Sequence, residues 1–124
     1  IAVLQGTTEA TLRVEAAPDA VRVALTATPA AAGSSGTLLF SPSSGELVMV
    51  ATGLAPLAAG EEYGCWIEVD GERTRIGKMY PGGELQAWAG PVDGLGYLPP
   101  DAKFGVSRVP ASGGAGEPVL VGGL

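Results

Sequence analysis

The sequence predicts an all-β fold, an antiparallel β-sandwich of about eight short strands. Short apolar runs recur along the chain, and several of them alternate apolar with polar residues, as a strand with one buried face does. Turn-forming residues separate these runs at intervals of about 8–12 residues, which is typical of β-sandwiches and small barrels. The 124 residues include 20 glycines and 10 prolines, which we assign to the turns between strands.

Residues 1–17 leave two interpretations open. Apolar side chains alternate over residues 12–16, as in a strand, but the second half of the segment lacks glycine and proline and also suits a short helix. Periodicity over so few residues does not decide between them. Pro18 ends whichever element precedes it. We therefore expect a linker or short helix over residues 1–17 and a β-sandwich domain over residues 18–124.

The strands are expected, in chain order, at residues 21–27, 37–41, 46–52, 63–69, 72–80, 84–89, 103–109 and 118–121. The first of them alternates regularly, so one of its faces is apolar. Pro42 and Gly45 separate the second from the third and predict a hairpin. The third is apolar at every position over residues 47–50, which indicates a strand covered on both faces.

Asp70-Gly71 is a strong signal for a two-residue hairpin turn between the fourth and fifth strands. The Pro-Gly-Gly of residues 81–83 predicts a further turn, and residues 90–101 and 110–116 are loops rich in glycine and proline. The fourth strand carries Trp66, whose burial removes about 150–250 Å² of surface. We expect its indole to lie in the core between two β-layers.

Charge and composition exclude several classes of function. The net charge of −6 repels phosphate, so binding to nucleic acid or to an anionic membrane is not expected. No stretch reaches the ~18 apolar residues of a transmembrane helix, and no signal-peptide pattern is present. The apolar residues 1–4 suit either the stub of a longer apolar segment or an ordinary terminus.

The chain has no histidine, which excludes Ser-His-Asp and Cys-His catalysis and most zinc sites. Its single cysteine, Cys65, cannot form an internal disulfide and is expected to be a small buried hydrophobe. The glycine-rich segments 94–96 and 113–116 precede no helix, so they do not predict phosphate binding. No catalytic, cofactor-binding or metal-ligating residue is predicted, and no cofactor.

The acidic clusters are Glu61-Glu62 and the trio Glu68, Asp70 and Glu72. Glu68 and Asp70 share a strand face, so a paired-acid site or a calcium site is conceivable there. The simpler interpretation is a solvated strand edge beside a turn, with Arg73 and Arg75 opposite as charge partners. We expect the simpler one.

Four aromatic residues keep a second class of function open. Trp66, Trp88, Tyr80 and Tyr97 would form a platform for sugars if they shared an exposed surface. The chain would then be a ligand- or carbohydrate-binding β-sandwich module of a bacterial surface protein.

The order of several short motifs resembles a known family. The motifs are Ala-Pro-Asp-Ala at 17–20, Gly-Thr-Leu-Leu-Phe-Ser-Pro at 36–42, Gly-Leu-Ala-Pro-Leu at 53–57, Tyr-Gly-Cys-Trp-Ile at 63–67, Gly77, Ser-Gly-Gly at 112–114, and Pro118 with Val-Leu-Val-Gly at 119–122. Together they resemble the C-terminal domain of the anti-sigma-K factor (RskA) family, whose members show a Gly-Leu-Pro-Pro loop, a Tyr-x-Leu-Trp strand and a Glu-Pro-x-Gly-Gly stretch in this order. Ala55, Cys65 and Val109 depart from that pattern.

The resemblance implies an extracytoplasmic β-domain of a membrane-anchored regulator. Family members carry a cytoplasmic anti-sigma domain, one transmembrane helix and then this domain outside the membrane, so the sigma factor would bind a domain that this chain lacks. Release of the sigma factor follows stepwise proteolysis, so a signal-dependent membrane protease is the other implied partner. The resemblance implies no enzymatic activity.

Overall fold

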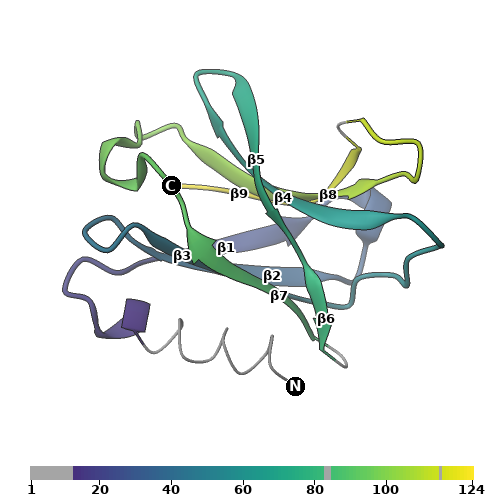
Figure 1. The fold of residues 1–124 in the computed structure, drawn as a ribbon, viewed down its shortest axis with the longest axis horizontal. Coiled ribbons are helices and arrows are strands. Elements are labelled where there is room, and N and C mark those ends of the chain that lie inside the picture. The colour runs from purple at the N-terminus through teal and green to yellow at the C-terminus, as the bar shows by residue number, and fades with distance from the viewer. Residues whose placement is uncertain (1–12, 83–84, 115) are drawn as a thin grey trace.

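The computed structural model describes residues 13–82, 85–114 and 116–124 (Figure 1). The strands in these residues are β1 (Val21–Ala27), β2 (Ser35–Ser41), β3 (Glu46–Thr52), β4 (Glu62–Val69), β5 (Glu72–Lys78), β6 (Tyr80–Gly82), β7 (Leu85–Pro91), β8 (Lys103–Val109) and β9 (Glu117–Gly123). Two short 3-10 helices, η1 (Pro29–Ala31) and η2 (Leu95–Tyr97), lie in the loops. Residues 13–16 are helical.

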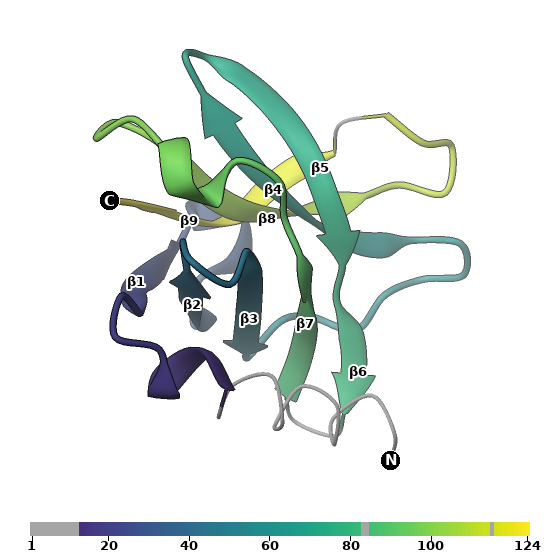
Figure 2. The same ribbon diagram turned by 60° about the vertical axis from the view of Figure 1, so that its left-hand side comes forward.

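The strands form a single sheet in the order β5-β4-β8-β9-β1-β2-β3-β7-β6, and every pairing is antiparallel. The sheet folds over so that β1, β2, β3 and β7 face β4, β8 and β9 (Figure 2). Its two edge strands, β5 and β6, are separated along the chain by Met79 alone. A single continuous segment therefore lies along both edges, and the sheet is a flattened, nearly closed barrel.

The all-β prediction is confirmed, and so are both hairpins. The loop between β2 and β3 is closed by a 2.9 Å hydrogen bond from the Gly45 N–H to the Ser41 carbonyl. Asp70 and Gly71 join β4 to β5 with φ values of 53° and 78°, the left-handed conformation that a tight hairpin turn of this kind requires. The helical interpretation of the N-terminal segment holds for residues 13–16. Residues 1–12 lie outside the described residues.

The turn predicted at residues 81–83 is wrong over its first two residues. Pro81 and Gly82 continue β6 and pair with Gln86 and Leu85 of β7. Proline is tolerated there because β6 is an edge strand. On an edge strand every second backbone N–H points away from the neighbouring strand and makes no hydrogen bond within the sheet, so a residue without an N–H fits there. Gly83 and Glu84, the last residue of that turn and the first of the following predicted strand, lie outside the described residues.

Two separate apolar clusters hold the described structure together. The larger fills the barrel and joins its two layers, with the rings of Phe40 and Phe104 5.7 Å apart. The smaller lies outside the barrel, where Val14 packs on Leu39 and Val48. In the described part of the chain no helix is long and apolar enough to span a membrane.

The position expected for Trp66 is wrong in one respect. Its side chain is buried, at 3% exposure, but it does not belong to the interior cluster, whereas its neighbours Cys65 and Ile67 do. Side chains alternate along β4, so the indole lies on the outer face of the barrel. It covers Gly105 of β8, which leaves no room for a side chain at that position. The guanidinium of Arg73 covers it from outside, 3.8 Å from the ring centroid.

Candidate functional site

The family-like motifs contact one another and hold the fold together. The Tyr63 hydroxyl donates a 2.7 Å hydrogen bond to the carbonyl of Ala55, which ties the Gly-Leu-Ala-Pro loop to β4. The indole N–H of Trp66 donates to the Ser107 hydroxyl on β8 at 2.9 Å. Both are contacts of buried aromatic side chains with a neighbouring element, so these motifs are structural.

The acidic clusters are engaged in ion pairs. Glu62 pairs with Arg75 at 2.5 Å, and Glu68 pairs with Arg73, its partner across the hairpin, at 3.3 Å. Arg73 is therefore the charge partner that the sequence predicted for Glu68, whereas Arg75 pairs with Glu62 of the other acidic cluster. Among the described residues no group of three histidine, cysteine or acidic side chains is placed to hold a metal ion.

Glu61 anchors the loop between β3 and β4. Its carboxylate accepts a 2.7 Å hydrogen bond from Arg108 and one from the Ala58 N–H at 2.8 Å. The bond from Arg108 is the main reason that the pKa of Glu61 lies below its usual value. Glu61, Glu62 and Glu68 are thus each paired with an arginine.

Cys65 is buried in the barrel, as predicted. Its thiol lies 3.3 Å from the sulfur of Met79, the residue between β5 and β6. Burial raises the pKa of the thiol to about 12, which leaves the reactive thiolate scarce at neutral pH. This environment suits a packing residue and not a nucleophile.

The four aromatic residues do not form one platform. Trp88 points into the barrel and packs against Gly77, while Trp66 lies on the outer face under Arg73. Tyr97, at 93% exposure, lies in η2, and Tyr80 lies on β6 at a distant part of the barrel (Figure 2). A groove of about 480 Å³ beside Tyr97 separates β5 from the loop that follows β7. No second aromatic ring lines it.

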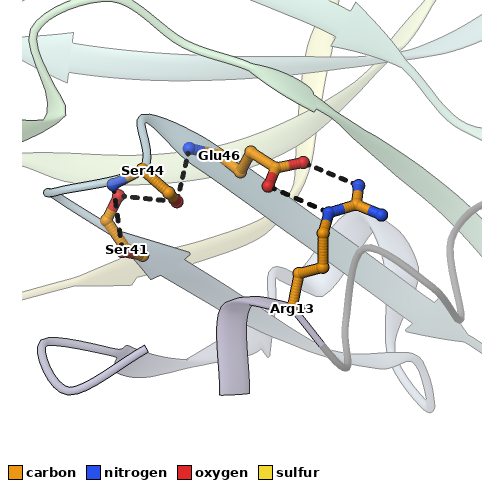
Figure 3. A network of polar contacts seen from close by, with 4 residues as sticks. All are labelled: Arg13, Ser41, Ser44 and Glu46. Carbon is orange, nitrogen blue, oxygen red and sulfur yellow. Dashed lines mark hydrogen bonds and ion pairs between the residues drawn. The ribbon is translucent and has the colours of Figure 1, made fainter. Parts of the chain in front are cut away.

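The segment that precedes β1 makes several polar contacts with the β2–β3 hairpin. Arg13 donates two hydrogen bonds to the Glu46 carboxylate, Nε to Oε1 at 3.2 Å and Nη2 to Oε2 at 2.8 Å (Figure 3). This two-point geometry is the strongest form of an arginine–carboxylate pair. Figure 3 also shows how the β2–β3 loop supports it: the Glu46 N–H donates to the Ser44 hydroxyl, and the Ser44 N–H donates to that of Ser41. The bond from Arg13 is the main cause that lowers the pKa of Glu46.

Asp19 holds the other end of the same segment. Its carboxylate accepts hydrogen bonds from the Ser41 hydroxyl at 2.8 Å, from the Ser43 N–H at 2.7 Å and from the Ser43 hydroxyl at 3.0 Å. These bonds, the one from Ser41 first, lower the pKa of Asp19. Asp19 therefore binds the loop at its β2 end, whereas Arg13 binds Glu46 at its β3 end.

Sequence reasoning did not single out this site. In the sequence, Pro18-Asp19 indicates only a break and part of a family-like motif, because the partners of Asp19 lie 22 and 24 residues further along the chain. Nothing in the sequence pairs Arg13 with Glu46, because 33 residues separate them and only the folded sheet brings them together.

The motifs, their order and the barrel agree with one comparison with known proteins. The family model described as "Anti-sigma-K factor rskA, C-terminal" matches residues 1–119. The curated proteins and the solved structures gave no significant match. Because the match covers nearly all of the 124 residues, this chain belongs to the family of C-terminal domains of anti-sigma-K factors.

Proposed function

We propose that this domain is the extracytoplasmic regulatory part of a membrane-anchored anti-sigma factor, and that it controls release of the sigma factor through regulated proteolysis. In this proposal residues 1–17 are the membrane-proximal linker or helix and residues 18–124 are the β-domain. The sigma factor binds a cytoplasmic domain outside this chain. A signal-dependent membrane protease makes the first cut. The domain catalyses no reaction of its own.

The observation that carries the proposal, beside the family, is the way the sheet closes. A protease needs an extended, accessible stretch of chain, and a folded domain supplies one only when it opens locally or globally. Here the described strands form one sheet, and a single continuous segment, β5–Met79–β6, supplies both of its edge strands, so a protease reaches the paired strands between them only when the sheet opens. The stability of the barrel then sets how often the protease finds a substrate.

The test is to destabilise the barrel in the full-length protein and measure sigma-dependent transcription in cells. Tyr63→Ala removes a ring at 1% exposure together with its hydrogen bond to Ala55, and should cost about 3–5 kcal/mol. Transcription should rise without the inducing signal. The matched control is Tyr97→Ala, which removes a tyrosine at 93% exposure and should leave transcription at its basal level.

Two results would contradict the proposal. One is unchanged transcription in Tyr63→Ala when the protein is present at its normal level and its anti-sigma domain is intact. The other concerns placement. An alkaline phosphatase fused after Leu124 is active only outside the cytoplasm, so an inactive but full-length fusion would place the domain inside.

A further inference from the structure

Residues 13–19 touch the barrel only from outside. Arg13 and Asp19 bind the two ends of the β2–β3 loop, and Val14, which has no exposed surface, packs between them on Leu39 and Val48. A further contact joins Glu15 to Arg22 of β1 at 3.3 Å. The segment is thus attached at four points to β1 and to the β2–β3 hairpin.

The barrel does not depend on these contacts. Among the described residues, none that precedes Val21 belongs to the interior cluster, and the strand ladder of β1 also begins at Val21, which pairs with Phe40. Removing the segment would uncover the small outer cluster but would leave every interior contact and strand pairing in place. A segment with few buried contacts, held mainly by exposed polar bonds, belongs to the least stable part of a fold.

We propose that residues 13–19 are a clasp that releases from the β2–β3 hairpin as one unit while the barrel stays folded, and that release exposes the peptide bonds of this segment to proteases. A chain of hydrogen bonds couples the Asp19 end of the clasp to the Arg13 end. The Ser41 hydroxyl donates to Asp19 and accepts from the Ser44 N–H, and the Ser44 hydroxyl accepts from the N–H of Glu46, the partner of Arg13. In the full-length protein the clasp would govern access to the membrane-proximal segment. That consequence rests on the proposed function, whereas the clasp itself does not.

Trypsin tests the clasp because two of its sites report on different openings. The bond after Arg13 becomes accessible when the clasp opens. The bond after Arg22 joins two residues of β1 that pair with Leu39 and Leu38 of β2, so it becomes accessible only when this strand pairing opens. Timed digestion of the 124-residue chain, with the fragments identified by mass spectrometry, gives both rates for each variant.

Weakening the clasp should raise the first rate alone. Glu46→Gln removes the charged partner of Arg13 and should speed cleavage after Arg13 by about two- to fivefold, the effect of losing a largely exposed ion pair. Val48→Ala removes part of the apolar surface on which Val14 packs and should speed cleavage after Arg13 roughly tenfold. The matched control is Glu68→Gln, which removes the similar Arg73 pair on the opposite layer and should leave cleavage after Arg13 unchanged.

The outcomes separate the clasp from the proposed function. If cleavage after Arg13 rises only in step with cleavage after Arg22, or if neither Glu46→Gln nor Val48→Ala changes it, the clasp is wrong. The same variants are then placed in the full-length protein in cells. Faster cleavage of the purified chain with increased sigma-dependent transcription supports both ideas. Faster cleavage with unchanged transcription supports the clasp and contradicts its control of access to the membrane-proximal segment, whereas the proposed function itself stands or falls with Tyr63→Ala.

Discussion

The indole of Trp88 on β7 packs directly against the backbone of Gly77 on β5. These strands are not paired with each other, since β5 lies at one end of the sheet order and β7 lies next to β6 at the other end. The contact therefore bridges the seam of the barrel, where the two ends of the sheet approach each other without strand pairing. The ring occupies the space that a side chain at position 77 would need, so the two residues together close the barrel where hydrogen bonds do not.

Gly77→Ala should destabilise the domain by about 1–3 kcal/mol, because the new methyl group collides with the Trp88 ring and forces it off its rotamer or moves β5. Urea unfolding followed by circular dichroism measures the change. Gly96→Ala is the control: its added methyl would have only the Pro42 carbonyl oxygen nearby, at 3.9 Å. Equal stability of the two variants would contradict the assignment of Gly77 as the closing contact.

Ser107→Ala should cost about 1–3 kcal/mol, since it leaves the buried indole N–H of Trp66 without an acceptor. In a Trp66→Phe background the donor is already gone, so the same substitution should cost much less. The two single variants and the double variant form a thermodynamic cycle whose coupling energy measures the bond. Simple additivity of the two substitutions would show that the bond contributes nothing to stability.

Acid should weaken the attachment of Asp19 and Glu46. Hydrogen bonds from Ser41 and Arg13 lower the pKa values of these carboxyls from their ordinary values of 3.8 and 4.5. A carboxyl whose pKa is lower in the folded state than in the unfolded state stabilises the fold at pH values above its unfolded-state pKa. This stabilisation is lost as the pH falls through the folded-state pKa. The melting temperature should be flat from about pH 7 to 5 and fall below about pH 4.

The comparison that isolates this effect is Asp19→Asn, which cannot titrate at that position. This variant should melt at a lower temperature than the wild type at pH 7, and its melting temperature should fall less steeply in acid. Parallel curves for the two proteins between pH 2.5 and pH 7 would mean that Asp19 contributes nothing to the acid response.

Cys65 should report opening of the whole barrel. It has no exposed surface and its thiol has a pKa raised to about 12, so a thiol reagent reaches it only in opened molecules. In native buffer at pH 8 the reaction should be at least about a thousandfold slower than in denaturant, as expected for the small unfolded fraction of a stable domain. Similar rates in the two solvents would show that the barrel opens readily.

Much of the fold could be predicted because its signals are local. Alternation located β1, and the Asp70-Gly71 turn located the β4–β5 hairpin to the residue. The extra strand β6 was missed because Pro81 and Gly82 usually mark turns, and only edge placement in the folded sheet permits them in a strand. The pair of Glu68 with Arg73 could also be predicted, since the hairpin register places the two opposite each other. The pair of Glu62 with Arg75 could not, because the register places Arg75 opposite Trp66.

The side on which each indole lies was harder to predict. Trp66 has apolar neighbours in a strand, which suggests a core residue, yet Cys65 and Ile67 take the inward positions and leave it outside. Its burial depends on Gly105 and Arg73, which come from two other strands. The clasp was beyond prediction for the same reason: its partners meet only after β2 and β3 have paired.

The two ends of the described chain enter the sheet side by side. The first strand, β1, and the last, β9, are neighbours in its middle, and only two residue pairs, Thr26 with Val121 and Ala27 with Leu120, join them. A pull on the N-terminal side first loads the contacts of residues 13–19 with the β2–β3 hairpin and then the β1–β2 pairs that begin at Val21. The joint to β9 lies at the far end of β1, so tension along the polypeptide would peel off the clasp before it parts the sheet in its middle.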